Sequence, residues 1–345
     1  MQQPFTQSLV RHAKTIFVAA LFFLSAAQHA SALTITPIKL ELHGNPGQTI
    51  KQEVTLYNEL DVQETLYVSY ANFEASGENG NPNFSDAHDD LGTWMQAADK
   101  ISLAPKSSQI IPLTINVPKD AAPGGHFAAV FWGTVPPGNS GNQVSIGAKT
   151  GLLVLLSVNG DVSENGGIIE YGIKSKQSLY TSLPITFFYR FQNNGADRVK
   201  PTGSILMKNM IGFTSATVPG NPVDGNVLPH STRRIETAWQ GSDGSNPVSD
   251  RDQGNFFNKA GYEWRNFAFG HYKANLTLAY GLKNQVTTAS VGFWVFPWHL
   301  LVLVVVVIIL LYLILKKLIR NYNAWVIKKA EQMLKREQSK TRTKV

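Results

Sequence analysis

The sequence contains no cysteine among its 345 residues. No disulfide, thiolate metal site or thiol nucleophile is therefore available anywhere in the chain. Whatever fold the chain adopts has to be stabilised by packed cores alone.

Sequence signatures of catalysis are also absent. The eight histidines are scattered, and there is no Gly-x-Ser-x-Gly nucleophile motif, no His-Glu-x-x-His zinc motif and no phosphate-binding loop. We therefore predict a protein that is not an enzyme and needs no cofactor. A hydrolase acting through the aspartate-rich segment described below is the enzymatic alternative.

The third absence is of helical periodicity in the region between residues 33 and 292. Apolar side chains alternate with polar ones instead, as where Ile185, Phe187, Tyr189 and Phe191 share one face of a strand. The 28 glycines and 17 prolines indicate many turns between short strands. The predicted fold class is all-β, with two tandem immunoglobulin-like β-sandwiches followed by a single transmembrane α-helix.

The N-terminal segment has the composition of a signal peptide. Arg11 and Lys14 precede an apolar run from Ile16 to Leu24, and Ala30-Ser31-Ala32 offers the small residues that signal peptidase accepts. We predict that residues 1–32 are removed before Leu33; the alternative is an uncleaved signal anchor. An exported protein without cysteine is more typical of bacterial surfaces than of eukaryotic receptors.

A second apolar segment, residues 293–315, is long enough to span a bilayer as a helix of roughly 35 Å. Trp294 and Trp298 stand at its outer end, and Tyr322 and Trp325 follow its inner end, as expected of aromatic rings at membrane interfaces. The alternative is a buried helix of a soluble protein.

Charge predicts the orientation of this segment. The tail, residues 316–345, holds ten Lys and Arg, among them Lys316, Lys317 and Arg320, against two Glu, a net charge of +8. Basic residues remain on the cytoplasmic side, so we expect a single-pass type I protein of the cell membrane with its ectodomain outside. Subtracting this +8 and the +2 of residues 1–32 from the whole-chain +7 leaves −3 for residues 33–315, which disfavours nucleic-acid binding.

The tail also has the pattern of an interfacial helix. Leu318, Tyr322, Trp325 and Met333 fall near one helical face with cations around them. We expect this helix to lie on anionic lipid, whereas an ordinary stop-transfer tail is the alternative.

The two halves of the ectodomain repeat one pattern. Ala104-Pro105-Lys106-Ser107 in the first half matches Leu228-Pro229-His230-Ser231 in the second, and Gly125-His126-Phe127 later matches Gly270-His271-Tyr272. Two matches in the same order predict a duplicated domain. We expect sandwiches at residues 33–160 and 167–292, separated by the turn-rich stretch 159–167.

The two histidines in these repeats sit where a strand crosses to the facing sheet. We expect His126 and His271 to cap a turn by hydrogen bonding to backbone; metal binding is the alternative.

The segment Gly77–Asp90 is the strongest candidate for a ligand site. It contains the carboxylates Glu78, Asp86, Asp89 and Asp90, whose oxygens suit Ca²⁺, together with His88. It lacks the glycine and closing glutamate of an EF-hand, so a solvated surface loop is the alternative.

Four tryptophans of the ectodomain are candidates either for the core or for stacking on a sugar ring. Trp132 ends an apolar strand and is assigned to the core, whereas Trp94 follows the polar segment and is assigned, with His88, to ligand binding. Trp239 and Trp264 stay open between the two roles.

The order of these features resembles that of a known family. The mature chain opens with Leu33-Thr-Ile-Thr-Pro-Ile38, then come Pro123-Gly124-Gly125, a duplicated sandwich, an anchor and a basic tail. This order is similar to that of the WxL-interacting proteins of Gram-positive cell surfaces. The resemblance implies a peptidoglycan-binding first domain and a partner-binding second domain.

Two functions follow as hypotheses. The first is a membrane-anchored surface protein whose tandem sandwiches bind a cell-envelope polymer such as peptidoglycan, or another surface protein. The second is an exported accessory or chaperone-like subunit that lends a sheet edge to a partner.

Overall fold

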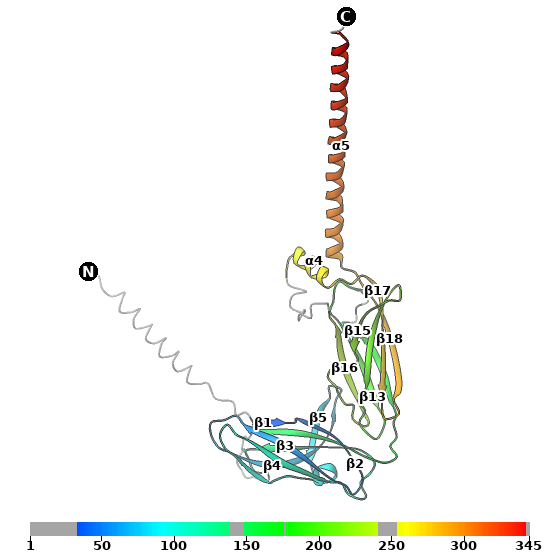
Figure 1. Ribbon diagram of the computed structural model, residues 1–345. Coiled ribbons are helices and arrows are strands. Elements are labelled where there is room, and N and C mark those ends of the chain that lie inside the picture. The colour runs from blue at the N-terminus through cyan, green and yellow to red at the C-terminus, as the bar shows by residue number, and fades with distance from the viewer. Residues whose placement is uncertain (1–32, 138–147, 176, 178, 241–253, 343–345) are drawn as a thin grey trace, which may run out of the picture. The chain divides into compact units, whose positions relative to one another are not determined.

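The structure is a computed structural model that describes residues 33–137, 148–175, 177, 179–240 and 254–342, the side chains of the last segment being described as far as Met333. The predicted signal peptide lies outside the described residues. The chain divides into two compact units, residues 1–74 with 82–162, and residues 75–81 with 163–345 (Figure 1). The division at Val162 falls within the turn-rich stretch expected to separate two domains.

The first unit is a β-sandwich. One sheet has the strand order β1-β3-β8-β6 and the other has the order β2-β10-β9-β4-β5, with β7 also paired to β4. The elements are β1 (Leu33–Thr36), β2 (Lys39–Gly44), β3 (Thr49–Asn58), β4 (Glu64–Ser76), β5 (Asn81–Asp86), α2 (Asp90–Trp94), β6 (Met95–Gln96), β7 (Lys100–Leu103), β8 (Ser108–Asn116), β9 (Gly124–Gly133) and β10 (Lys149–Val158).

The second unit contains a second sandwich and two helices. Its sheets have the orders β11-β13-β16 and β12-β18-β17-β14-β15. The elements are β11 (Gly166–Ile173), β12 (Leu179–Tyr180), β13 (Ile185–Asn193), β14 (Thr202–Asn209), β15 (Thr214–Pro219), β16 (Ser231–Trp239), α4 (Phe256–Arg265), β17 (Gly270–Tyr280), β18 (Gln285–Val295) and α5 (Trp298–Arg342).

The two sandwiches have matching topologies, apart from the additional short strands β6 and β7. In both, the second strand in chain order lies at the edge of a sheet and pairs in parallel with the last strand of the sandwich: β2 with β10, and β12 with β18. The two Pro-Ser turns also match: Ser107 Oγ donates to the Ala104 carbonyl at 2.8 Å, and Ser231 Oγ to the Leu228 carbonyl at 2.7 Å. The predicted fold of two tandem sandwiches followed by a helix is confirmed, and the common strand order supports the predicted duplication.

A buried asparagine occupies the same place in each sandwich. Asn58 ends β3 and Asn193 ends β13, and both are fully buried. Asn58 Nδ2 donates to the carbonyls of Val62, Leu103 and Ala104, while its Oδ1 accepts from the backbone N–H of Leu60. The Asn193 amide makes the equivalent bonds, so in each sandwich one side chain joins three backbone segments.

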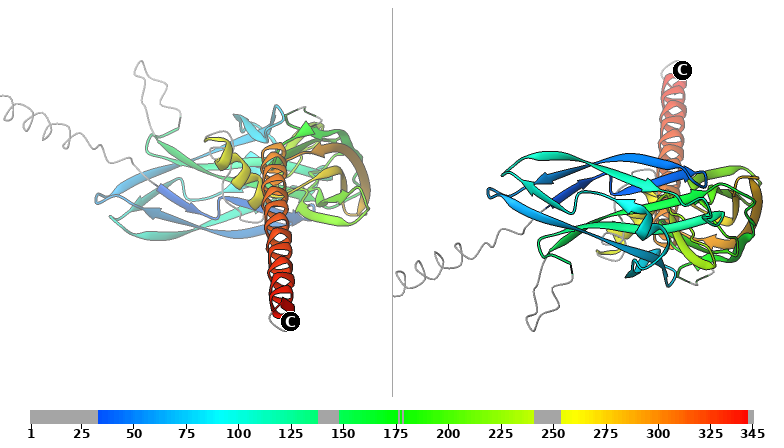
Figure 2. Two further views of the ribbon diagram at one scale, coloured as in Figure 1. Left: turned by 90° about the horizontal axis from the view of Figure 1, so that it is seen from above. Right: turned by 90° about the horizontal axis from the view of Figure 1, so that it is seen from below.

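Apolar side chains that alternate along the strands form the core of each sandwich. The inward residues of β9 include Val130 and Trp132, which are completely buried, so the assignment of Trp132 to the core is confirmed. In the second unit Phe187, Tyr189 and Phe191 of β13 are buried against Phe293 of β18 and other residues of the facing sheet. Figure 2 shows the strands of the sandwiches in two further views.

Helix α4 was not expected from the sequence. It begins at Phe256, and the preceding residue Asn255 is its N-cap, since the Asn255 side-chain oxygen accepts from the backbone N–H of Asn258 at 3.0 Å. Ala260, Tyr262 and Glu263 form its buried side. Ten residues form fewer than three turns, which is too short a stretch for a helical period to be recognised between strands.

Candidate functional site

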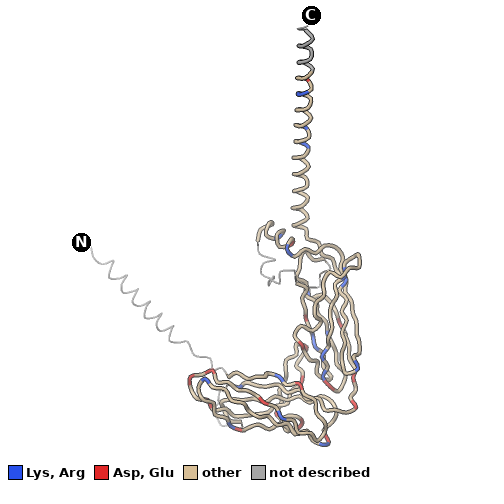
Figure 3. Tube along the Cα trace, in the orientation of Figure 1, with Lys and Arg blue, Asp and Glu red and all other residues tan. Residues whose placement is uncertain are grey.

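Helix α5 leaves the second sandwich directly after β18. Over Trp298–Met333 it is long and apolar enough to cross a membrane, and almost all of its side chains lie outside the core of the unit. Figure 3 shows that its first turns carry no Lys, Arg, Asp or Glu and that Lys and Arg appear only further along.

The apolar segment predicted at residues 293–315 begins too early. Phe293 and Val295 are the last inward residues of β18 and are 1% exposed in the core of the second sandwich. The helix starts at Trp298, after Pro297, and continues without a break through the basic tail to Arg342. The end of a buried strand and a membrane helix are both apolar. A prediction from composition therefore included the last residues of β18 in the membrane segment.

A buried carboxylate joins α4 to the first turn of α5. Glu263 is 3% exposed, and its Oε2 accepts from the backbone N–H of Leu300 at 2.8 Å. Its Oε1 lies 2.7 Å from His299 Nδ1. Glu263 therefore satisfies a backbone N–H that the helix itself leaves without a partner, and it fixes α4 beside the start of α5 (Figure 1).

We expect Glu263→Ala to loosen this junction, because a buried N–H left without an acceptor costs about 1–3 kcal/mol. The backbone amide of Leu300 should exchange with solvent deuterium faster than in the unsubstituted protein. Glu263→Gln, which keeps one carbonyl oxygen, should have a smaller effect. Unchanged protection of Leu300 in the alanine variant would contradict this role.

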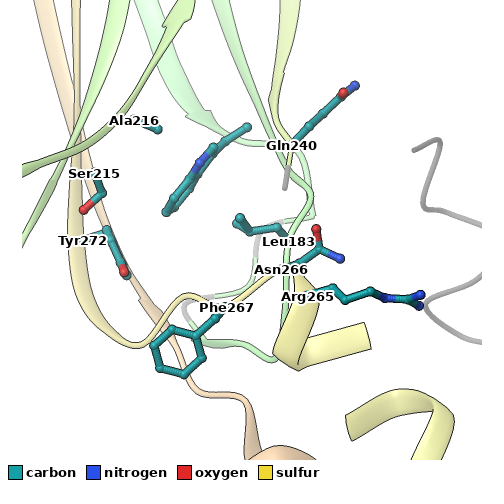
Figure 4. Close-up of a pocket in the computed structure, with 9 residues that line it drawn as sticks. Leu183, Ser215, Ala216, Gln240, Arg265, Asn266, Phe267 and Tyr272 are labelled. Atoms are coloured by element: carbon teal, nitrogen blue, oxygen red, sulfur yellow. The ribbon is translucent and has the colours of Figure 1, made fainter. Parts of the chain in front are cut away.

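A pocket of about 660 Å³ opens at this same end of the second unit (Figure 4). Its walls come from five separate segments: the chain just before β13, strand β15, the end of β16 with the residue after it, strand β17, and the end of α4 with the two residues after it. The lining residues are Leu183, Ser215, Ala216, Trp239, Gln240, Arg265, Asn266, Phe267 and Tyr272.

The floor of the pocket is aromatic and rigid. The rings of Trp239 and Tyr272 meet edge to face at 5.1 Å between centroids, and Tyr272 stacks on Phe293 at 5.9 Å. Tyr272 Oη accepts from the backbone N–H of Phe269 at 3.3 Å, and Tyr262 Oη donates to the Leu183 carbonyl at 3.0 Å. These bonds hold the segment that follows α4 against the sandwich.

The polar side chains of the pocket are Ser215, Gln240, Arg265 and Asn266. Ser215 and Asn266 lie at its sides, whereas the Arg265 side chain extends away from its centre (Figure 4). Among the described residues that line the pocket there is no His, Asp, Glu or Lys. A volume of this size with an apolar floor is typical of a binding pocket.

The carboxylates proposed for calcium do not come together. Glu78 belongs to the second unit, where it accepts from Arg190 Nε at 2.8 Å; hydrogen bonds from this guanidinium hold the pKa of the Glu78 carboxyl below its ordinary value. Asp86 pairs only loosely with His88, at 3.9 Å, and both are highly exposed. Among the described residues no group of three or more His, Cys, Asp and Glu is placed to hold a metal ion.

Asp89 and Asp90 have structural roles in the first unit. Asn72 Nδ2 donates to Asp89 Oδ1 at 3.2 Å, and the carboxylate of Asp90 pairs with His126 Nδ1. The segment Gly77–Asp90 is also not a loop throughout, because it contains β5 and reaches the start of α2. Its polar composition concealed a strand whose side chains are mostly exposed.

His126 makes the predicted contact with backbone, since its Nε2 lies 2.8 Å from the Ala122 carbonyl oxygen. Trp94, assigned from the sequence to ligand binding, is half-buried against the core of the first sandwich, with its ring centroid 4.7 Å from that of His126. His271 instead contacts Trp294 at 5.2 Å between ring centroids.

The predicted membrane-interface residues fall into two groups. Trp294 is an exposed residue of β18, and Trp298 is the first residue of α5. Further along α5, Lys316, Lys317 and Arg320 precede Tyr322 and Trp325, whose rings lie 6.2 Å apart, with Lys329 Nζ 4.6 Å from the Trp325 centroid. The pocket residues Tyr272 and Leu183 were not anticipated, because nothing local distinguishes them from other core residues.

Comparison with known proteins gives only distant likenesses. No family model matches the chain, and no curated protein matches it significantly. Among solved structures, the class 5 fimbriae chaperone CfaA is 14% identical, with 75% of this chain and 98% of that chain covered at a TM-score of 0.37. The Escherichia coli chaperone DraB is 8% identical over 76% and 97% of the two chains at a TM-score of 0.30.

A further likeness is to a chain in the complex of the Salmonella enterica SafA pilin with the SafB chaperone. It is 8% identical, and 78% of this chain and 99% of that chain are covered at a TM-score of 0.32. Scores of this size carry no argument about function, so the function proposed below rests on the described residues.

Proposed function

We propose that this chain is a non-enzymatic, membrane-anchored surface protein whose second sandwich binds an apolar segment of a partner protein. The observation that carries the proposal is the pocket at the α5 end of that sandwich. Its floor of Trp239 and Tyr272 offers buried aromatic surface, the kind that anchors a partner side chain.

The anchor in this proposal is α5. Its apolar part is followed by the basic residues 316–345, which favour a cytoplasmic position for the tail and an ectodomain outside the cell membrane. Binding of the tail to anionic lipid belongs to the same proposal, because Trp325 and Tyr322 accompany cations along the helix.

The first sandwich has the role that the resemblance to WxL-interacting proteins implies, binding peptidoglycan. The full-length protein in detergent should then sediment with purified cell walls. Failure to sediment would remove the polymer from the proposal and would leave the pocket of the second sandwich as the binding site.

The chaperone-like alternative is favoured by one observation, the position of β15. This strand is at the end of the sheet order β12-β18-β17-β14-β15, and two of its residues, Ser215 and Ala216, line the pocket. A partner strand added to β15 would place side chains beside the pocket. Protection of the β15 amides from hydrogen exchange on partner binding would distinguish strand addition from insertion of a side chain alone.

Filling the pocket tests the proposed function. Ser215 is exposed on β15, and Ser215→Trp places a large ring at the pocket wall, so we expect partner binding at least about tenfold weaker, equivalent to 1.4 kcal/mol. The measurement is recovery of a stoichiometric partner protein with the full-length chain from its native membranes in detergent.

Thr217→Trp is the matched control. Thr217 is exposed on the same strand, two residues further along, but does not line the pocket. Equal recovery of the partner with both variants would show that the pocket is not the binding site.

A further inference from the structure

Exposed aromatic side chains are concentrated where α5 leaves the second sandwich. On α4, Phe257 and Trp264 are 70% and 68% exposed although they are large apolar residues. They are seven positions apart and so lie on one stripe of the helix, beside its buried side. Phe267 and Phe269 continue this surface after α4, and the rings of Phe269 and Phe296 lie 5.9 Å apart.

A second element at the same end also presents apolar side chains. The turn between β14 and β15 carries Met210, Ile211 and Phe213, all more than half exposed. Asn209 precedes this turn and pairs in register with Tyr272, near the start of β17. Because Gly270 of β17 pairs with Val295, just before α5, the turn lies at the α5 end of the sandwich.

The conformation of this turn is held by hydrogen bonds. Asn209 Oδ1 accepts from the backbone N–H groups of Ile211 and Phe213 at 3.1 and 3.0 Å, and its carbonyl accepts from Gly212 at 2.9 Å. The exposed apolar side chains are therefore displayed by an ordered turn. Two independent elements with such surfaces at one end of a unit indicate an interaction site.

The length of α5 sets the height of this surface relative to a bilayer. Residues 298–315 are 18 residues, or about 27 Å of helix, that contain no Lys, Arg, Asp or Glu, and their one histidine, His299, is paired with Glu263. The hydrocarbon layer of a bilayer is about 30 Å thick, so the whole of this stretch fits inside it. The boundary between hydrocarbon and headgroups therefore lies at the first turn of α5. That is the turn to which Glu263 fixes α4, so α4 lies at the level of the lipid headgroups.

Charge agrees with this position. Cations near this end include Lys259 and Arg265 of α4 and the register partners Lys208 and Lys273. Of the described carboxylates at this end, Glu263 is buried and paired with His299, and Glu236 is paired with Lys174. Aromatic rings accompanied by cations are typical of protein surfaces that enter the headgroup layer.

We infer that α4 and the β14–β15 turn form a membrane-seating surface that inserts into the headgroup layer on the sandwich side of the bilayer. The inference rests on the proposed anchoring by α5 and adds a second attachment, which holds the second sandwich and its pocket against the lipid. The occupant of this surface is lipid rather than a protein, because the surface is continuous with the start of the membrane helix.

The cysteine-free sequence makes a direct test straightforward, since a single introduced cysteine is the only site for a nitroxide label. Gly261 of α4 has no other heavy atom within 4 Å of an added Cβ and lies between Phe257 and Trp264, so Gly261→Cys leaves the aromatic stripe intact. The full-length protein, labelled and reconstituted in phosphatidylcholine–phosphatidylglycerol vesicles, is probed with oxygen and with a water-soluble nickel chelate.

Two other labels calibrate the measurement. Leu282→Cys, 84% exposed in the turn between β17 and β18, lies at the far end of the sandwich and reports water, and Ile308→Cys in the middle of α5 reports hydrocarbon. We expect the ratio of oxygen to nickel collisions at Gly261→Cys to be several-fold higher than at Leu282→Cys and below that at Ile308→Cys. Adding Phe257→Ser and Trp264→Ser should return the Gly261→Cys label to the ratio found in water.

The outcomes separate this inference from the anchoring on which it rests. A water-like ratio at Ile308→Cys would overturn the anchoring itself. A hydrocarbon-like ratio at Ile308→Cys with a water-like ratio at Gly261→Cys would overturn the seating surface alone. The exposed aromatic side chains would then be assigned to contact with a partner protein.

Discussion

Asn193→Ala is expected to destabilise the second unit by about 3 kcal/mol while the first unit remains unchanged. Asn193 Nδ2 donates to the carbonyls of Asp197 and Val227 at 2.8 and 3.0 Å, and its Oδ1 accepts from the N–H of Gly195 at 2.9 Å. The Val227 carbonyl keeps its hydrogen bond from the Val199 N–H. The variant therefore leaves chiefly the Asp197 carbonyl and the Gly195 N–H without a partner, and each such group costs about 1–3 kcal/mol of stability. Hydrogen exchange of the full-length protein in increasing denaturant measures the loss in each unit.

Asn194→Ala is the control for this substitution. Asn194 is the next residue and is exposed, and its backbone N–H bond to the Asn165 carbonyl survives the change. Asn58→Ala should give the mirror result, destabilising the first unit and sparing the second. A loss below about 1 kcal/mol, within the range of surface substitutions, would show that the asparagine does not join the segments as described.

Three aspartates in the middle of α5 are expected to convert the protein from an integral to an extractable one. Val305, Ile308 and Leu311 are all more than half exposed and contribute nothing to the core of the second sandwich, so the substitutions leave its fold intact. Each aspartate near the centre of a spanning helix costs roughly 3 kcal/mol, so the three together disfavour insertion by about 9 kcal/mol. Extraction of membranes with alkaline carbonate measures the change.

Val305→Leu, Ile308→Leu and Leu311→Ile provide the matched control, since they keep the apolar character at the same positions. The control protein should stay in the pellet and the aspartate protein should appear in the supernatant. Retention of both in the pellet would mean that the chain is held in the membrane by something other than α5.

The sequence predicted the architecture well because its signals are local. Alternation along one strand, as at Phe187 and Tyr189, depends only on neighbouring residues, and the inward ones are buried. The repeated Pro-Ser turns were recognisable for the same reason, since the hydroxyl of Ser107 reaches a carbonyl only three residues earlier.

Predictions that needed distances between separate segments were less successful. Glu78 and Asp90 are twelve positions apart in a polar stretch, yet one pairs with Arg190 and the other with His126. Density of carboxylates in a sequence says nothing about their separation when a strand such as β5 lies between them. Trp94 is partly buried against the first sandwich, a contact that the polar residues before it do not indicate, and its assignment to ligand binding stays a prediction.

The sequence by itself determined the class of the fold, the duplication and the apolar helix with its basic end, because each follows from periodicity, repetition or composition along a continuous stretch. Only the tertiary structure decided where α5 begins, since Phe293 and Val295 are equally apolar in a sandwich core and in a membrane helix. It also decided the pocket and the exposed apolar surface at the start of α5. Residues as distant as Leu183, Ser215 and Tyr272 meet there because the strand order of the second sandwich brings them to one end.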